Sequence, residues 1–426
     1  MRRNRREVSI QDFHELNIGA MWRYFRSESL AFWMICAYLF LEYVRPQSIY
    51  PTLDILPWTQ LAVLGALLGC FLDKTVRWVS SSTNTWLVLF FVTILLSSIF
   101  AYWPQISYGQ LQNFYTWFII YFLIVNIVNT EKRFFIFIFI FFVASFKLSL
   151  SLSITWAKRG FSFADWGLKG PPGFFENSGE LAIQMLVFWP IAWAFALYLK
   201  PNVGKLKYYV LLLMPITAIM VIMGASSRGA QLALAIQLVA LNYRSILKPK
   251  VLASFLLIAS LLWVFLPQEQ KARFQVVGDD RTSQQRLLYW ENGIEMINQH
   301  PILGVGYFNY VPYYEKFYRN DMLYDQAELP HNIFIQIGTD AGYLGLIFYL
   351  LLLFSSLRKV IFFNRETLLL EGRRPNFQSC FNISLLGFVV AGQFVTVSYY
   401  PFFWIHLALV VSMINSYSSK LNCKKI

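Results

Sequence analysis

Apolar residues in this chain form long blocks that recur from residue 29 to residue 418, with short polar segments between them. A helix needs about 20 apolar residues to cross the roughly 30 Å of bilayer hydrocarbon, and most of these blocks approach that length. The pattern therefore predicts an all-α polytopic membrane protein with about twelve transmembrane helices. The expected spans are 29–44, 54–72, 84–101, 112–129, 134–152, 180–199, 207–224, 229–243, 251–267, 331–356, 378–397 and 401–418.

Polar segments at the ends and between the spans define the domain organisation. We expect an N-terminal tail at 1–28, one transmembrane helical domain at 29–418, and a C-terminal tail at 419–426. Two connections are longer than the rest. One, 156–179, is rich in Gly, Pro and aromatic residues, which is typical of an ordered loop at a membrane interface. The other, 268–330, is a large loop that contains a helical pattern.

The basic residues predict how the chain is oriented. The segments on the side of the two tails hold 24 of the 36 Lys and Arg residues, and those on the other side hold 11. By the positive-inside rule both termini are cytoplasmic and the 268–330 loop is outside. Composition agrees, because 57% of the residues are hydrophobic, only 14% are charged and the mean hydropathy is +0.48. The net charge of +13 is then explained by the basic cytoplasmic segments, which face anionic membrane lipid. No nucleic-acid partner is therefore expected.

Other features narrow the function classes. The four cysteines, Cys36, Cys70, Cys380 and Cys423, fall in spans or on the inner side, so neither a disulfide nor a cysteine metal site is expected. No small-residue cleavage site follows the first span, which should stay as an anchor. The chain has no phosphate-binding glycine loop, and its outer loops contain no acidic pair or His/Cys cluster with the spacing of metal ligands. We therefore expect no nucleotide, metal or cofactor.

The large outer loop carries the pattern of one amphipathic helix. In "DDRTSQQRLLYWENGIEMINQHPILGVG", Asp280 or Ser283 can cap a helix that ends at His300-Pro301 and Gly304. The predicted apolar stripe consists of Leu287, Trp290, Ile294 and Ile297. Such a helix is expected to lie on the membrane body or flat at the interface.

Ionisable residues at the outer ends of the spans are the candidates for chemistry, because burying a charge in a bilayer costs about 2.5–3.5 kcal/mol or more. Arg228 in "GASSRGAQ" stands at the outer start of a helix, where free backbone N–H groups favour an anion; an interfacial arginine that reaches the lipid headgroups is the alternative. Arg286 is the second candidate for a functional arginine, and the alternative is that it is a solvated loop residue or one stacked on a Trp ring.

His331 in "LPHN" is expected in the first turn of an apolar helix, where a neutral imidazole can accept a proton, although the spacing equally suits a structural histidine. Asp340 follows nine residues later, on the opposite face of a straight helix, so we expect it to be structural, with Gly338 and Gly342 allowing close approach. His406, about one turn inside the last span, either joins the same cavity or bonds a neighbouring carbonyl.

Two arginines and a histidine on the outer side suit one task, which is to hold a lipid diphosphate while a hydroxyl is activated. Arginine binds phosphate oxygens bidentately and stabilises the charge that grows on a departing diphosphate. The histidine would act as a base for the incoming hydroxyl, or orient it.

Four ordered stretches carry a family resemblance. They are "GPPGFFENSGELA" (170–182), "GASSRGAQLALA" (224–235), "RLLYWENGIEMINQHPILGVGYFNY" (286–310) and "HNIFIQIGTDAGYLGL" (331–346). With them the chain resembles the O-antigen ligase and polymerase superfamily of membrane glycosyltransferases.

The resemblance implies a GT-C-like fold in the bacterial inner membrane and inverting transfer of undecaprenyl-diphosphate-linked glycan at the periplasmic face, without nucleotide sugar or required metal. It also implies that Arg228 and Arg286 contact the diphosphate and that His331 acts on the acceptor hydroxyl. Residues expected to be accessory are Lys169, Asn177, Arg281, Trp290, Asn332 and His406. Many relatives have proline then asparagine where this chain has "ENSG" (176–179), which leaves the role of Asn177 open.

The acceptor stays open between lipid A core and a second lipid-linked glycan, both in surface polysaccharide or lipopolysaccharide biosynthesis. A protein O-oligosaccharyltransferase of the same superfamily is an alternative. A flippase or exporter of lipid-linked glycan is the rival from another class. Transporters usually carry paired repeats and charges near mid-membrane, whereas the candidates here cluster at the outer edge.

Overall fold

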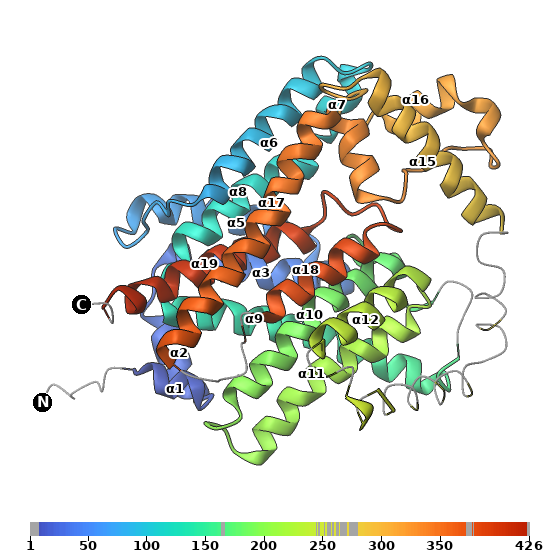
Figure 1. Cartoon of the computed structure of the whole chain (residues 1–426). Coiled ribbons are helices and arrows are strands. Elements are labelled where there is room, and N and C mark those ends of the chain that lie inside the picture. Colours follow the sequence, from blue (N-terminus) through green and yellow to red (C-terminus); the bar gives the residue numbers. More distant parts are fainter. Residues whose placement is uncertain are drawn as a thin grey trace, which may run out of the picture.

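The computed structural model describes residues 8–162, 167–243, 280–371 and 379–423, with a few single residues between 245 and 271 and Phe377. Every regular element in these residues is a helix. Long helices pack side by side, while α15 (Arg281–Gln299) and α16 (Tyr310–Phe317) lie together at one side of the molecule. The first helices, α1 (Ile10–His14) and α2 (Ile18–Arg26), and the end of the last helix lie at the opposite side (Figure 1).

Eleven of the predicted spans fall on described residues, and each coincides with a helix. The helices are α3 (Leu30–Val44), α5 (Trp58–Leu72), α6 (Ser82–Ile99), α8 (Gln112–Ile127), α9 (Glu131–Lys158), α10 (Ser178–Leu199), α11 (Lys205–Gly224), α12 (Arg228–Leu241), α17 (Ile333–Glu371), α18 (Ser379–Ala391) and α19 (Pro401–Cys423). Most of the predicted span 251–267 lies outside the described residues. The last helix continues to Cys423, so it occupies part of the expected C-terminal tail.

Six helical segments of the described chain are long and apolar enough to cross a membrane. They are Pro51–Leu72, Ser82–Ile99, Glu131–Lys158, Ser178–Leu199, Lys205–Gly224 and Ile333–Phe363, and shorter apolar helices occur at Gln112–Ile127, Arg228–Leu241, Ser379–Ala391 and Pro401–Tyr417. The chain is therefore a multi-pass membrane protein. The count of twelve spans stays a prediction.

Short helices occupy the connections and the N-terminal tail. Besides α1 and α2, they are α4 (Pro46–Ile49), η1 (Pro51–Leu53), α7 (Pro104–Gln110) and η2 (Arg319–Asp321). The tail is tied to the membrane domain, because Phe13 is fully buried and its ring meets that of Phe135 on α9 edge-on at 5.5 Å.

Helix α10 is the most enclosed of the six candidate spans, with 83% of an 18-residue apolar stretch buried inside the protein. A buried glutamine on α12 ties it to two neighbours. Gln237 accepts a hydrogen bond from the indole of Trp189 (2.7 Å) and donates to the carbonyl oxygens of Leu186 and Ile383. Gly387 on α18 leaves the space that this side chain needs, because a Cβ there would lie 2.0 Å from the Gln237 amide. The bond network holds α10, α12 and α18 in one register.

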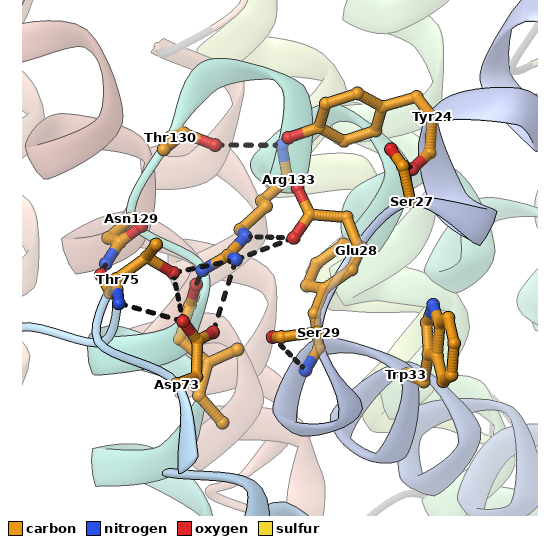
Figure 2. Close-up of polar contacts among 12 residues, drawn as sticks. Tyr24, Ser27, Glu28, Ser29, Trp33, Asp73, Thr75, Asn129, Thr130 and Arg133 are labelled. Carbon is orange, nitrogen blue, oxygen red and sulfur yellow. Dashed lines mark hydrogen bonds and ion pairs between the residues drawn. The ribbon is translucent and has the colours of Figure 1, made fainter.

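A buried ionic cluster joins the turn between α2 and α3, the residues that follow α5, and the start of α9. The Arg133 guanidinium contacts Glu28 at 2.6 Å and Asp73 at 3.3 Å, and it donates to the Thr75 hydroxyl at 2.9 Å (Figure 2). The side chains of Arg133, Glu28 and Asp73 are 5%, 9% and 7% exposed. Removing one partner from such a buried group leaves an uncompensated charge and costs about 3–5 kcal/mol, so this cluster locks three segments together.

The amphipathic helix predicted in the outer loop exists, and the predicted apolar stripe is only partly buried. Helix α15 is capped by Asp280, one of the two expected caps, and ends at Gln299, next to the expected stop at His300-Pro301. Leu287 and Ile294 of the expected stripe are 57% and 51% exposed. Ile297 of the stripe is buried, in an inward face that also contains Gln285, Tyr289, Asn292, Gly293 and Met296.

Polar partners explain why that face is turned inward. Asn292 donates to the Tyr314 hydroxyl and to the Asp321 carboxylate, and Gln285 donates to the Asp321 carbonyl. The apolar pattern predicts that these polar side chains face water. They instead find hydrogen-bond partners in a second, tyrosine-rich core formed by α15, α16 and η2.

Helix α17 is interrupted at Gly342, where φ is 66° and ψ is −169°. A side chain there would collide with the backbone of Ile302, only 2.4 Å from the Cβ position. The Tyr343 N–H, which the break frees from the helix, donates to the Pro301 carbonyl at 2.8 Å. The glycine thus lets the loop after α15 pack directly on the helix backbone.

Candidate functional site

The segment 392–400, between α18 and α19, contacts the starts of three long helices. The Ile333 N–H of α17 donates to the Gly392 carbonyl at 2.9 Å. At the start of α12, Gly229 faces Phe394, and at the start of α10, Gly179 faces Val395. Glycine is required at Gly229 because a Cβ would come within 2.6 Å of the Phe394 ring. Because the N-terminus of a helix is the positive end of its dipole, this convergence favours an anion.

Arg228 is the first residue of α12, after a turn in which Ser226 has a left-handed backbone (φ 58°) and Ser227 caps the helix. Both terminal nitrogens of Arg228 lie 3.4 Å from Oδ2 of Asp280, the residue that caps α15. The two side chains are 33% and 30% exposed. A partly exposed ion pair with so long an N–O distance contributes only about 0–1 kcal/mol to stability. An incoming anion can therefore displace Asp280 from Arg228.

Arg286 lies less than two turns into α15 and belongs to the same cluster. Burial lowers the pKa of its guanidinium and the charge of Arg228 lowers it further, whereas the charges of Glu328 and Asp280 raise it. The buried Nε atom makes no hydrogen bond with any residue that the structure describes. The two positive charges repel each other, and the buried Nε–H has no acceptor among the described residues. A bound anion would offset the repulsion and accept the hydrogen bond.

His331 contacts this cluster through Glu328. The imidazole Nε2 lies 3.0 Å from Oε2 of Glu328, and the side chains are 26% and 71% exposed. The bond with His331 holds the pKa of the Glu328 carboxyl below its ordinary value, and the charge of Arg286 contributes in the same direction. The structure therefore brings together the three residues that the sequence singles out.

The position of His331 in its helix differs from the prediction. Helix α17 begins at Ile333, so His331 precedes the first turn, and its backbone is left-handed with φ 51°. Its N–H donates to the Thr396 hydroxyl at 2.9 Å. Asn332 takes the capping role, because its side-chain oxygen accepts from the N–H groups of Phe334 and Ile335. His331 therefore stands outside the helix, between Pro330 and the capping Asn332.

Asp340 makes hydrogen bonds of the kind expected for a structural residue. Its Oδ1 accepts from the Phe308 N–H at 3.0 Å, and its carbonyl oxygen accepts from the Ser97 hydroxyl of α6. The carboxylate therefore ties the loop after α15 to the break in α17.

The residues expected to be accessory divide into two groups. Trp290 lies close to the cluster, since its indole donates to the Pro330 carbonyl at 2.8 Å. Asn332 also lies there and donates to Gln393. Lys169 is exposed next to Leu168, whose N–H donates to the Gly224 carbonyl before the Arg228 turn. Asn177 precedes α10 as its N-cap residue.

Two of the expected accessory residues have partners elsewhere. Arg281 donates to the Leu323 carbonyl, and its guanidinium lies 4.6 Å from the centre of the Tyr324 ring. His406 is buried, and its Nε2 lies 2.9 Å from the Phe381 carbonyl oxygen. Of the two readings for His406, the bond to a neighbouring carbonyl is therefore confirmed.

The sequence reasoning missed Glu328 and the 392–400 segment. Glu328 stands three residues before His331, separated from it by a proline, and that spacing is a weak signal in one sequence. The segment 392–400 reads as the end of one apolar span and the start of the next, so nothing local marks it as part of a site.

Fold and site define the class: a multi-pass helical membrane protein with a cluster of two arginines, a histidine and carboxylates where several helices begin. Residues 210–350 match the family model Wzy_C, described as O-Antigen ligase. The matched segment is about a third of the chain and includes Arg228, Arg286 and His331. The match supports the O-antigen ligase/polymerase superfamily indicated by the sequence motifs. Comparison with curated proteins gives no match.

Proposed function

We propose that this protein is a glycosyltransferase of the inner membrane that transfers or polymerises undecaprenyl-diphosphate-linked glycan at the periplasmic face. The acceptor in this proposal is lipid A core or a second lipid-linked glycan. The observation that carries the proposal is the pairing of two guanidinium groups, one with an unsatisfied buried donor, beside a histidine held by a carboxylate.

In the proposed reaction, Arg228 and Arg286 bind the diphosphate of the donor. Asp280 releases Arg228 as the phosphate oxygens take its place, which its weak 3.4 Å contact permits. Because arginine keeps its charge and binds bidentately, the pair stabilises the negative charge that develops on the leaving diphosphate.

His331 acts on the acceptor. Its free ring nitrogen accepts the proton of the acceptor hydroxyl as that oxygen forms a bond to the anomeric carbon, and the bond from that carbon to the diphosphate breaks. Undecaprenyl diphosphate leaves and the anomeric configuration inverts. Glu328 holds the imidazole in place and stabilises the positive charge that it gains. Neither a metal nor a nucleotide takes part in this scheme.

Reconstitution tests the proposal. The purified chain in liposomes receives undecaprenyl-diphosphate-linked glycan and, in separate reactions, lipid A core, further lipid-linked glycan or a hydroxyl-containing peptide. We expect a glycosylated lipid A core or a lengthened lipid-linked glycan, and no product with the His331→Ala variant. A glycopeptide would assign the chain to protein glycosylation. Movement of intact donor across the bilayer without any product would refute the enzyme and favour a flippase.

A further inference from the structure

A second feature lies far from this cluster, at the other end of α17. A cavity of about 680 Å³ opens between the start of α6, the second half of α17 and α19. It is lined by Ser82, Trp86, Leu351, Phe354, Ser355, Arg358, Lys359, Phe362, Phe363 and Ile414.

The cavity and the candidate site are separated by most of the membrane-spanning length. Helices α6 and α17 run antiparallel and side by side (Figure 1). Ser97 bonds the Asp340 carbonyl at one end, and Thr83 bonds Ser355 at 2.8 Å at the other. Ser97 follows Thr83 by 14 positions, which corresponds to roughly 21 Å of helix. The cavity thus belongs to the end of the bundle opposite the loop after α15.

The polar part of the lining is cationic. Arg358 and Lys359 contribute two positive charges, and the described residues that line the cavity include no carboxylate. Among the residues that the structure describes, neither cation forms an ion pair. Ser82 adds the first turn of α6, an 18-residue helix whose N-terminal dipole also favours negative charge.

Apart from Ser355, the rest of the lining is apolar, and this apolar surface continues along the exposed face of α17. Phe354 and Phe362 are 56% and 50% exposed. Leu350 and Ile347, four and seven residues before Phe354, are exposed as well, so they extend the apolar surface along one face of the helix. A ligand that fits has one anionic end and a long apolar part that runs along the helix.

We propose that this cavity binds an anionic phospholipid. The headgroup phosphate lies between Arg358 and Lys359 near the start of α6, and one acyl chain runs past Phe354 along Leu350 and Ile347. The Lys ammonium and the Arg guanidinium each attract an anionic headgroup, and together they select anionic over zwitterionic lipid. The lipid belongs to the leaflet opposite the candidate site, so this site is separate from donor binding.

Native mass spectrometry of the delipidated full-length protein tests this proposal. Dioleoylphosphatidylglycerol and dioleoylphosphatidylcholine are titrated separately. We expect the phosphatidylglycerol adduct to form with several-fold higher affinity. In the double variant Arg358→Gln/Lys359→Gln, we expect its affinity to fall about tenfold, to the level of phosphatidylcholine. The matched control is Arg23→Gln/Arg26→Gln, which removes two exposed cations from α2 and should leave binding unchanged.

Three outcomes would overturn the proposal. They are equal binding of the two lipids, phosphatidylglycerol binding that survives the double variant, and an equal loss in the α2 control. Competition by glycerol phosphate at lipid-equivalent concentration would likewise overturn the role of the acyl chain. If the double variant does not fold, Arg358→Gln alone carries the test, because Arg358 is exposed and its loss leaves packing intact.

Discussion

The imidazole Nε2 of His331 lies 3.0 Å from Oε2 of Glu328, and the backbone N–H of His331 is bound to the Thr396 hydroxyl. The ring and the backbone of this residue are therefore held by different segments of the chain. With Nε2 engaged, Nδ1 is the ring nitrogen left for an acceptor hydroxyl.

We expect Glu328→Gln to lower kcat while leaving the KM for the donor unchanged, because the amide keeps a polar contact but loses the charge that stabilises the protonated ring. The predicted loss is on the order of tenfold to a hundredfold, part of what general base catalysis supplies. Steady-state kinetics in liposomes measure both constants. A raised donor KM with normal kcat would assign Glu328 to donor binding instead.

His331→Ala should abolish transfer, with a loss of about 10²–10⁴-fold, while the protein still folds and inserts. The imidazole is partly exposed, and its bond to the largely exposed Glu328 side chain should contribute little to stability. His300→Ala is the matched control, since His300 also neighbours a proline and bonds the Tyr313 hydroxyl at 3.1 Å. Normal surface glycan in cells that carry only the His331 variant would exclude the catalytic role.

Arg228→Lys should reduce activity by about tenfold to a hundredfold although the charge is kept. An ammonium cannot reproduce the two parallel hydrogen bonds of a guanidinium to phosphate oxygens. Arg281→Lys serves as the control, because Arg281 is held by the Leu323 carbonyl and the Tyr324 ring. Full activity of the Arg228 variant would show that this arginine only reaches lipid headgroups.

The buried ionic cluster around Arg133 predicts a pH-dependent stability. Burial alone would raise the pKa of Asp73, but hydrogen bonds from Ser29 and Thr75 and the charge of Arg133 bring it below its ordinary value. The folded pKa is thus the lower one, and the stability it provides is complete above the ordinary value, near 3.9, and is lost as pH falls through the folded pKa.

Asp73→Asn should therefore lower the melting temperature at pH 7, and the difference from wild type should shrink as the pH falls toward 3. Thermal unfolding in detergent micelles at several pH values measures it. A difference that stays constant with pH would mean that Asp73 acts through packing and not through its charge.

Membrane topology is tested by cysteine labelling. In a variant with Cys36, Cys70, Cys380 and Cys423 replaced by serine, Asp325→Cys should react with an impermeant maleimide applied from the periplasm. A cysteine placed between Arg365 and Arg373 should react only after permeabilisation. The reverse labelling pattern would turn the Arg228 cluster toward the cytoplasm and remove the basis of the proposed reaction.

Much of the helical framework follows from the sequence, because hydrophobicity is a property of local stretches and a long apolar run has few alternatives to a helix in lipid. The cap at Asp280 and the end of α15 are also local signals, and both are confirmed. The buried face of α15 was not predictable in this way. Its outcome depends on Tyr314 and Asp321, which lie beyond the helix and offer hydrogen bonds to the polar side.

The sequence by itself determined that the chain is a multi-pass helical protein, and its motifs singled out Arg228, Arg286 and His331. Only the tertiary structure decided that these three lie in one cluster with Asp280 and Glu328, and that His331 stands before its helix with its N–H bound to Thr396. The physical reason is the sequence separation of the contacts. Helix formation in lipid depends on neighbours within a few residues, whereas the contacts that build the cluster join residues up to 65 positions apart.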